Sequence, residues 1–174
     1  GQVQQRRLAR PRRAHERRQL ARGLSLRLVP AGGRQKKSLP RGRDPPAPGL
    51  ALVSADDDVF YPRWWLERLV ATHRAHPGDV VAHRAHRIGL ADDRIVPYAS
   101  WTPATPGVAS PLHLATGVGG VLHPPAMLAA LRAAGTAFPD ELRRVDDVWL
   151  HLVALRAGLA VRQVDPRPGL FASV

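Results

Sequence analysis

A short apolar run that ends in three consecutive aspartates is the feature that most restricts the fold of this chain. Residues 49–54 read GLALVS, and Asp56, Asp57 and Asp58 follow after a single alanine. A run of this length without polar alternation indicates a strand buried on both faces, as in the centre of an α/β sheet. Ligands of such sheets bind beyond the carboxyl ends of the strands. We therefore expect the three carboxylates at a ligand-binding edge.

The segments around this run alternate between strand and helix patterns. In the helix expected over residues 146–157, Val148, Leu152 and Leu155 form the predicted buried stripe. Strands that alternate with helices predict an α/β domain with a largely parallel sheet. Strands are predicted over residues 24–29, 49–54, 79–83, 117–122 and 160–164, the fourth of them entered through a glycine-rich turn. Helices are predicted over residues 63–76, 126–134 and 146–157.

Composition narrows the class of protein further. Apolar residues make up 44% of the 174 residues and aromatic residues only 5%, so we expect a core built mainly from Ala, Leu and Val. The sequence contains no cysteine, which excludes a disulfide framework, a thiolate zinc site and a cysteine nucleophile. No stretch approaches the ~20 apolar residues that cross a bilayer, and the start of the chain has no apolar signal core. A cytoplasmic protein is expected, with peripheral membrane contact left open.

The formal net charge of +12 is confined to the first quarter of the chain. Residues 1–43 contain 14 of the 26 basic residues and one acid, whereas residues 44–174 carry a net charge of −1. Residues 1–22 have almost no large apolar side chains, so we expect a basic, flexible segment ahead of an α/β domain over residues 23–174. Such a segment can bind polyanions. Aromatic residues for base stacking do not occur in residues 1–59, and nucleic acid is not the expected partner.

The aspartate cluster is the first candidate for chemistry. Adjacent carboxylates repel one another, and a divalent cation relieves that repulsion. The hard oxygen ligands of Asp56, Asp57 and Asp58 favour Mn²⁺ or Mg²⁺. The alternative is an electrostatic role at the start of the helix that begins near Pro62, but one acid is enough for that. Three acids in succession therefore indicate a function in binding a metal ion or in phosphate chemistry.

A second pair of acids begins the helix predicted over residues 146–157. Asp146 and Asp147 either interact with the helix N-terminus or, held near a sheet edge, accept a proton from a hydroxyl nucleophile. The two interpretations are compatible, because one acid can cap the helix while the other reacts. Before them, Gly119 and Gly120 lie in a glycine-rich stretch that permits close approach of the backbone to a ligand or unusual backbone angles.

Aromatic and histidine side chains give weaker signals. Trp101 lies in a loop-rich segment and is a candidate to stack on a sugar ring, with packing on the core as the alternative. The pairs His73/His76 and His83/His86 have a spacing that can ligate zinc. Their Arg-rich surroundings instead indicate surface positions.

Five of these segments together resemble bacterial GT-A-type nucleotide-sugar glycosyltransferases, close to the large family 2 group. The resemblance extends over about residues 20–164, and its motifs occur in the family's order at plausible spacing. The chain is similar to a member that is shortened at its N-terminus, because little more than one strand precedes the aspartates. The matching segments are residues 33–40 (GRQKKSLP), 53–66 (VSADDDVFYPRWWL), 80–86 (VVAHRAH), 116–125 (TGVGGVLHPP) and 146–150 (DDVWL).

The resemblance implies a GT-A-like, Rossmann-like fold and a metal-dependent sugar transfer. Asp56, Asp57 and Asp58 would form the DxD motif that binds Mn²⁺ or Mg²⁺ on the donor diphosphate, with Asp56 and Asp57 also close to the donor. The metal would offset charge on the departing nucleoside diphosphate. Lys36 or Lys37 would contact the diphosphate as a point charge.

The resemblance also assigns the acceptor side. Asp147 would be the catalytic base, with Asp146 as the alternative, and Gly119 and Gly120 would line the acceptor site together with Trp101. The expected partners are a nucleotide-sugar donor and a carbohydrate or other hydroxyl acceptor in polysaccharide or glycoconjugate synthesis.

Three other functions stay open on the sequence. One is a non-catalytic remnant of the same fold. Another is a polyanion-binding protein that acts through its basic N-terminal segment. The third is a phosphohydrolase of the haloacid-dehalogenase type, whose pattern is weakened by Phe60 two residues after Asp58.

Overall fold

The computed structural model describes residues 19–20, 24–31, 49–135, 139, 142, 145–166 and 171–172. The expected helices and four of the five expected strands are found with boundaries shifted by at most two residues, whereas the strand expected over residues 117–122 begins only at Val121, after a 3₁₀ turn at Gly117–Gly119. Within residues 1–22, Gln19 and Leu20 form a short strand that pairs with the next one. The elements of the first half are β1 (Gln19–Leu20), β2 (Leu24–Ala31), β3 (Leu50–Asp56), α1 (Trp64–Ala75), β4 (Val80–Ala82), β5 (Ala85–Arg87), β6 (Leu90–Ala91), β7 (Arg94–Ile95) and η1 (Tyr98–Ser100). The second half adds β8 (Thr102–Pro103), β9 (Ala109–Ser110), β10 (His113–Ala115), η2 (Gly117–Gly119), β11 (Val121–His123), α2 (Pro125–Ala134), α3 (Asp146–Arg156) and β12 (Val161–Gln163).

The main sheet is mixed, so the expectation of a largely parallel sheet is wrong. Its described strands lie in the order β1-β2-β3-β11-β4-β12-β9. Among these strands β2 is parallel to β3 and β4 is parallel to β12, while every other neighbouring pair is antiparallel. The reason lies in the path from β4 to β11. A parallel neighbour needs a long crossover, usually a helix, and residues 83–120 supply only short strands and two 3₁₀ turns.

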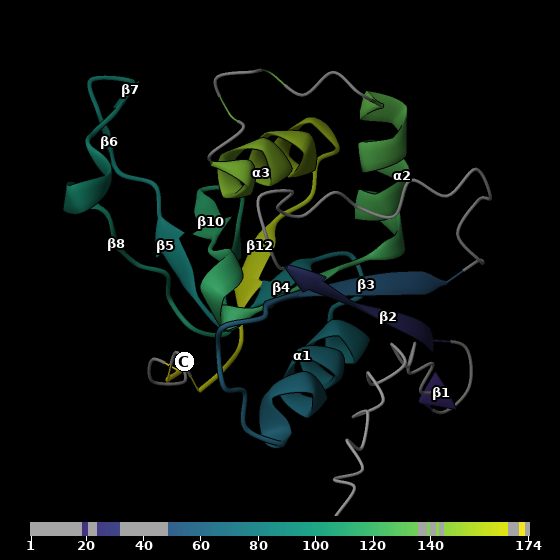
Figure 1. Cartoon of the computed structure of the whole chain (residues 1–174). Coiled ribbons are helices and arrows are strands. Elements are labelled where there is room, and N and C mark those ends of the chain that lie inside the picture. Colours follow the sequence, from purple (N-terminus) through teal and green to yellow (C-terminus); the bar gives the residue numbers. More distant parts are fainter. Residues whose placement is uncertain are drawn as a thin grey trace, which may run out of the picture.

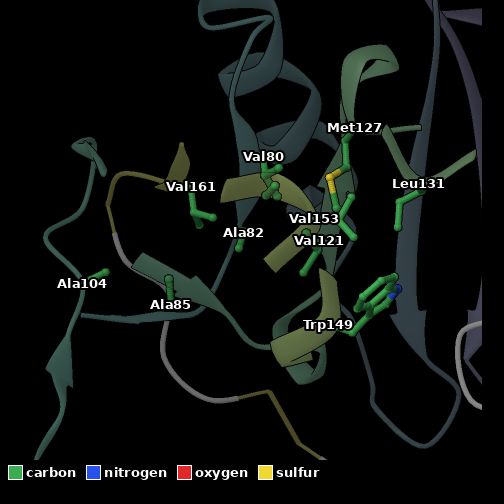
Figure 2. Close-up of a cluster of buried hydrophobic side chains, with 11 residues drawn as sticks. Val80, Ala82, Ala85, Ala104, Val121, Met127, Leu131, Trp149, Val153 and Val161 are labelled. Atoms are coloured by element: carbon green, nitrogen blue, oxygen red, sulfur yellow. The ribbon is translucent and has the colours of Figure 1, made fainter. Parts of the chain in front are cut away.

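Helices cover the two faces of this sheet. In Figure 1, α1 lies on one side of the sheet and α2 and α3 lie on the other. The side chains follow the two-residue alternation of a strand: Val81 and Leu122 belong to the core under α1, and Val80 and Val121 to the core under α2 and α3. Figure 2 shows this second core, where Met127 and Leu131 of α2 and Trp149 and Val153 of α3 lie over the sheet residues.

Two smaller sheets are formed by strands between β4 and β11 in the sequence. The strands β10, β5 and β8 form an antiparallel sheet, and β6 and β7 form a hairpin that projects from the body (Figure 1). Its turn residues Asp92 and Asp93 both have positive φ, as a two-residue hairpin turn requires. The described helices include none that is long and apolar enough to cross a membrane.

Candidate functional site

One edge of the main sheet collects the ends of several strands because β11 runs against its neighbours. β3 and β4 both pair antiparallel with β11, so they share a direction and end at the edge where β11 begins. Val121, the first residue of β11, pairs with Ser54 on one side and Ala82 on the other. The aspartates that follow β3 and the glycine-rich turn that precedes β11 therefore meet at the same edge.

Tyr61 connects the aspartate cluster to this glycine-rich turn. The backbone N–H of Asp56 donates to the Tyr61 Oη at 3.0 Å, and the Tyr61 hydroxyl donates to the carbonyl oxygen of Val118 at 3.1 Å. Asp56 is half-buried at the end of β3, and Asp57 and Asp58 are exposed in the turn that follows. This role of Tyr61 could not be predicted from the sequence, since only the tertiary structure brings Val118 within its reach.

Gly119 and Gly120 are buried and pack against side chains of the body. The Trp65 Nε1–H donates to the Gly119 carbonyl at 2.7 Å. Gly120 has φ +85°, and a Cβ there would lie 2.2 Å from the Trp65 ring. A Cβ at Gly119 would lie 3.0 Å from the backbone nitrogen of Arg84. Both glycines thus allow the turn to pack closely on α1 and on the segment after β4.

Asp147 ties the start of α3 to the same turn. The backbone N–H of Gly117 donates to the Asp147 Oδ2 at 3.2 Å. Asp146 and Asp147 are both half-buried in the first turn of α3, and the preceding N-cap residue, Val145, makes no side-chain capping bond. The two candidate bases are therefore next to the glycine-rich turn that Tyr61 joins to the aspartates.

The buried face of α3 differs from the predicted one. Val148 and Leu155 are exposed, at 40% and 41%, so the stripe expected through Val148, Leu152 and Leu155 is wrong. The helix instead buries Trp149 and Val153 with their neighbours, because it packs against both α2 and the sheet. This rotation turns Asp147 toward the sheet, where it lines a small cavity.

Trp101, a predicted acceptor-site residue, lies away from the acid and glycine segments. Trp101 is half-buried beside the β6–β7 hairpin, where its Nε1–H donates to the carbonyl of Val96 at 2.9 Å and its ring meets Tyr98 edge-on. These two partners, Val96 and Tyr98, belong to neither the acid segments nor the glycine segment. Lys36 and Lys37 lie outside the described residues, so their expected contact with a diphosphate stays a prediction.

Two histidines expected at the surface are buried. His73 packs on the covered face of α1, one turn after Leu69, and His83 lies directly after β4. The His83 Nε2–H donates to the Trp65 carbonyl at 2.8 Å. Burial lowers the pKa of His83 to about 4, with a smaller effect of the Arg68 charge in the same direction. In each of the two pairs one ring, His73 or His83, is buried in the core beneath the site, whereas its partner, His76 or His86, is exposed or half-buried.

The aspartate cluster has the donor chemistry for a divalent cation. Its ligands are carboxylate oxygens at an exposed turn, the type that Mn²⁺ and Mg²⁺ prefer. Among the described residues, no three His, Asp or Glu side chains are grouped so as to enclose a metal ion alone. A cation held by Asp56, Asp57 or Asp58 would therefore take its further ligands from water or from phosphate oxygens of a substrate.

No protein-family model matches the sequence, and no curated protein matches it.

Proposed function

We propose that this chain is a GT-A-type glycosyltransferase that moves a sugar from a nucleotide-sugar donor to a hydroxyl acceptor with the help of Mn²⁺ or Mg²⁺. One observation carries the proposal. Three segments that are far apart in the sequence are connected by hydrogen bonds at one sheet edge, through Tyr61 Oη to Val118 and Gly117 N–H to Asp147. The segments are the aspartates 56–58, the glycine turn 117–120 and the acids 146–147.

The aspartates supply the donor side of the reaction. Asp56, Asp57 and Asp58 would hold the cation, which when bound would neutralise charge on the nucleoside diphosphate as it leaves. Asp56 is anchored through its backbone N–H to Tyr61, so its position is linked to that of the glycine turn. Because the backbone of Asp56 is fixed in this way, its carboxylate has fewer positions to leave when a ligand binds, which reduces the reorganisation that binding requires.

Asp147 supplies the acceptor side. The acceptor hydroxyl attacks the anomeric carbon, the new C–O bond forms, and the bond to the diphosphate breaks with its electron pair. The hydroxyl proton passes to the Asp147 carboxylate, which acts as general base. The N–H of Gly117 orients that carboxylate by binding its Oδ2. Asp146, the neighbouring acid, is the alternative base.

A panel of nucleotide sugars with Mn²⁺ tests this function. We expect one donor to raise the melting temperature and to release its nucleoside diphosphate when a hydroxyl acceptor is present.

Asp58→Ala should weaken Mn²⁺ binding in the presence of the nucleoside diphosphate, measured by calorimetry. Asp93→Ala, which removes an exposed acid from the β6–β7 turn, is the matched control and should bind as wild type. Equal binding by Asp58→Ala and wild type would contradict the metal assignment.

A further inference from the structure

A small cavity lies between the main sheet and α3, directly behind Asp147. Its volume is about 20 Å³. Four polar side chains line it: Ser54 of β3, His123 of β11, and Asp147 and His151 of α3. The other lining residues are apolar, so the polar groups are concentrated on facing positions of the sheet and the helix.

His151 is the feature of this cavity that needs an explanation. Its side chain is more than nine-tenths buried, and among the described residues neither ring nitrogen has a hydrogen-bond partner. A buried polar atom without a partner loses its hydrogen bonds to water and gains none in return, so such atoms are rare in folded proteins. His151 follows Asp147 by four residues on α3, which puts both on the same helix face.

The size of the cavity restricts what it can hold. A cavity needs about 10–15 Å³ on this measure to contain one water molecule, and 20 Å³ is far too small for a sugar or a nucleotide. A metal ion is not favoured, since no three ligating side chains are grouped for one in the described part of the chain. A single water molecule fits the volume, and the four polar side chains within the mostly apolar wall offer it hydrogen-bond partners.

We propose that one buried water molecule in this cavity joins His151 to Asp147, and that His151 is a positioning residue for the Asp147 carboxylate. The positioning role rests on the proposed transferase function, whereas the water bridge does not. Ser54 offers the water a further partner, because its hydroxyl lies in the same cavity and 3.3 Å from the Nε2 of His123. Asp147 is then held from two sides, by the N–H of Gly117 and by the water.

The protonation state of His151 suits this role. Burial lowers the pKa of His151, so the ring is neutral near pH 7, with one nitrogen that donates and one that accepts. A neutral ring can donate a hydrogen bond to the water through one nitrogen or accept one through the other. It also adds no charge that would hold Asp147 in a direct ion pair.

A high-resolution crystal structure of the full chain tests the bridge without any assay of transfer. We expect electron density for a water within hydrogen-bond distance of a His151 ring nitrogen and an Asp147 oxygen. In ¹⁵N-histidine-labelled protein, Asp147→Asn should then shift the His151 ring resonances and leave those of His73 unchanged. A dry cavity, or a direct bond between His151 and Asp147, would overturn the inference.

Kinetics test the positioning role. His151→Phe removes both nitrogens at similar volume, and we expect kcat to fall roughly tenfold or more with little change in the donor KM, as for a misplaced catalytic group. His151→Gln, which can still bind the water, should restore most of the activity. His73→Phe, at a buried histidine of α1, is the matched control and should leave kcat unchanged.

Stability separates this role from simple damage to the fold. Phenylalanine keeps the apolar packing of the ring, and the water keeps its bonds to the other polar groups of the cavity, so His151→Phe should melt within several degrees of wild type while its kcat falls. Wild-type kcat in His151→Phe would overturn the positioning role. If wild type itself transfers no sugar, the transferase proposal fails, and the crystal structure still decides the water bridge.

Discussion

Asp146 and Asp147 are adjacent residues with the same side chain, yet their proposed roles differ. Asp147 accepts the N–H of Gly117 and lines the cavity behind the sheet edge. Asp147→Asn keeps the shape and an oxygen that can accept this hydrogen bond but removes the base. We expect turnover to fall ~10²-fold or more, with donor binding and melting temperature nearly unchanged. Steady-state transfer and thermal melting measure the two effects.

Asp146→Asn is the matched control for this change. It makes the same substitution one residue earlier on α3 and should leave most of the turnover intact. If Asp146→Asn is the damaging change instead, the base is Asp146. If neither change affects transfer, the acid pair has only a helix-terminus role and the proposed mechanism is wrong.

Gly120 shows how much the site depends on close packing at one position. An alanine there would place its Cβ 2.2 Å from the Trp65 ring, and its φ of +85° is unfavourable for any other residue. Overpacking and backbone strain each cost about 1–3 kcal/mol, so Gly120→Ala should lower the free energy of unfolding by at least about 2 kcal/mol. Gly78→Ala, where a Cβ would meet nothing within 4 Å, should be within about 0.5 kcal/mol of wild type in the same urea titration.

At the scale of elements, α3 offers a comparison of one substitution on two faces. Val153 is 3% exposed in the core under α2 and α3, whereas Val148 is 40% exposed. Val153→Ala should lower the free energy of unfolding by about 1–3 kcal/mol through lost burial and a cavity. Val148→Ala should change it by less than about 0.5 kcal/mol. Chemical denaturation distinguishes the two, and the reverse order would restore the stripe that the sequence indicated.

Features of the fold that depend on neighbouring residues could be predicted from the sequence, and features that depend on distant segments could not. The helices were predictable because Pro62 and Pro125 near helix starts and Gly158 after a helix end act within a few residues of the chain. The antiparallel direction of β11 could not be predicted, because it depends on the path of the chain from β4 to β11. The buried face of α3 was missed for a similar reason, since Val148 and Leu155 fit one helical stripe and Trp149 and Val153 fit another.

The candidate site shows the same division. The acids and glycines could be selected from residue type and order alone. Tyr61, Ser54 and His151 could not, because their significance lies in partners from distant segments: Val118 for Tyr61, and the shared cavity for the other two. A half-buried hydroxyl or imidazole needs a partner, and the sequence does not reveal which segment supplies it.

At the scale of the whole molecule, buried histidines should make stability sensitive to acid. Burial lowers the pKa of His73, His83, His113 and His151, that of His83 to about 4 from an ordinary value of 6.5. Between those two pH values the unfolded chain binds more protons than the folded one, so the free energy of unfolding decreases as pH falls. His83 alone should account for roughly 3 kcal/mol across that window, at about 1.4 kcal/mol per pKa unit.

Urea titrations at a series of pH values from about 7 down to about 5, on wild type and His83→Gln, test this source of acid sensitivity. A glutamine amide can donate to the Trp65 carbonyl as His83 does, but it does not titrate. We expect a smaller loss of stability per pH unit in His83→Gln than in wild type, while His76→Gln, at an exposed histidine, should keep the wild-type slope. Carboxylates contribute equally to all three proteins, so they cancel in the comparison. Parallel slopes for wild type and His83→Gln would mean that His83 is not held neutral in the core, and the packing of Trp65 and Gly120 above it would need revision.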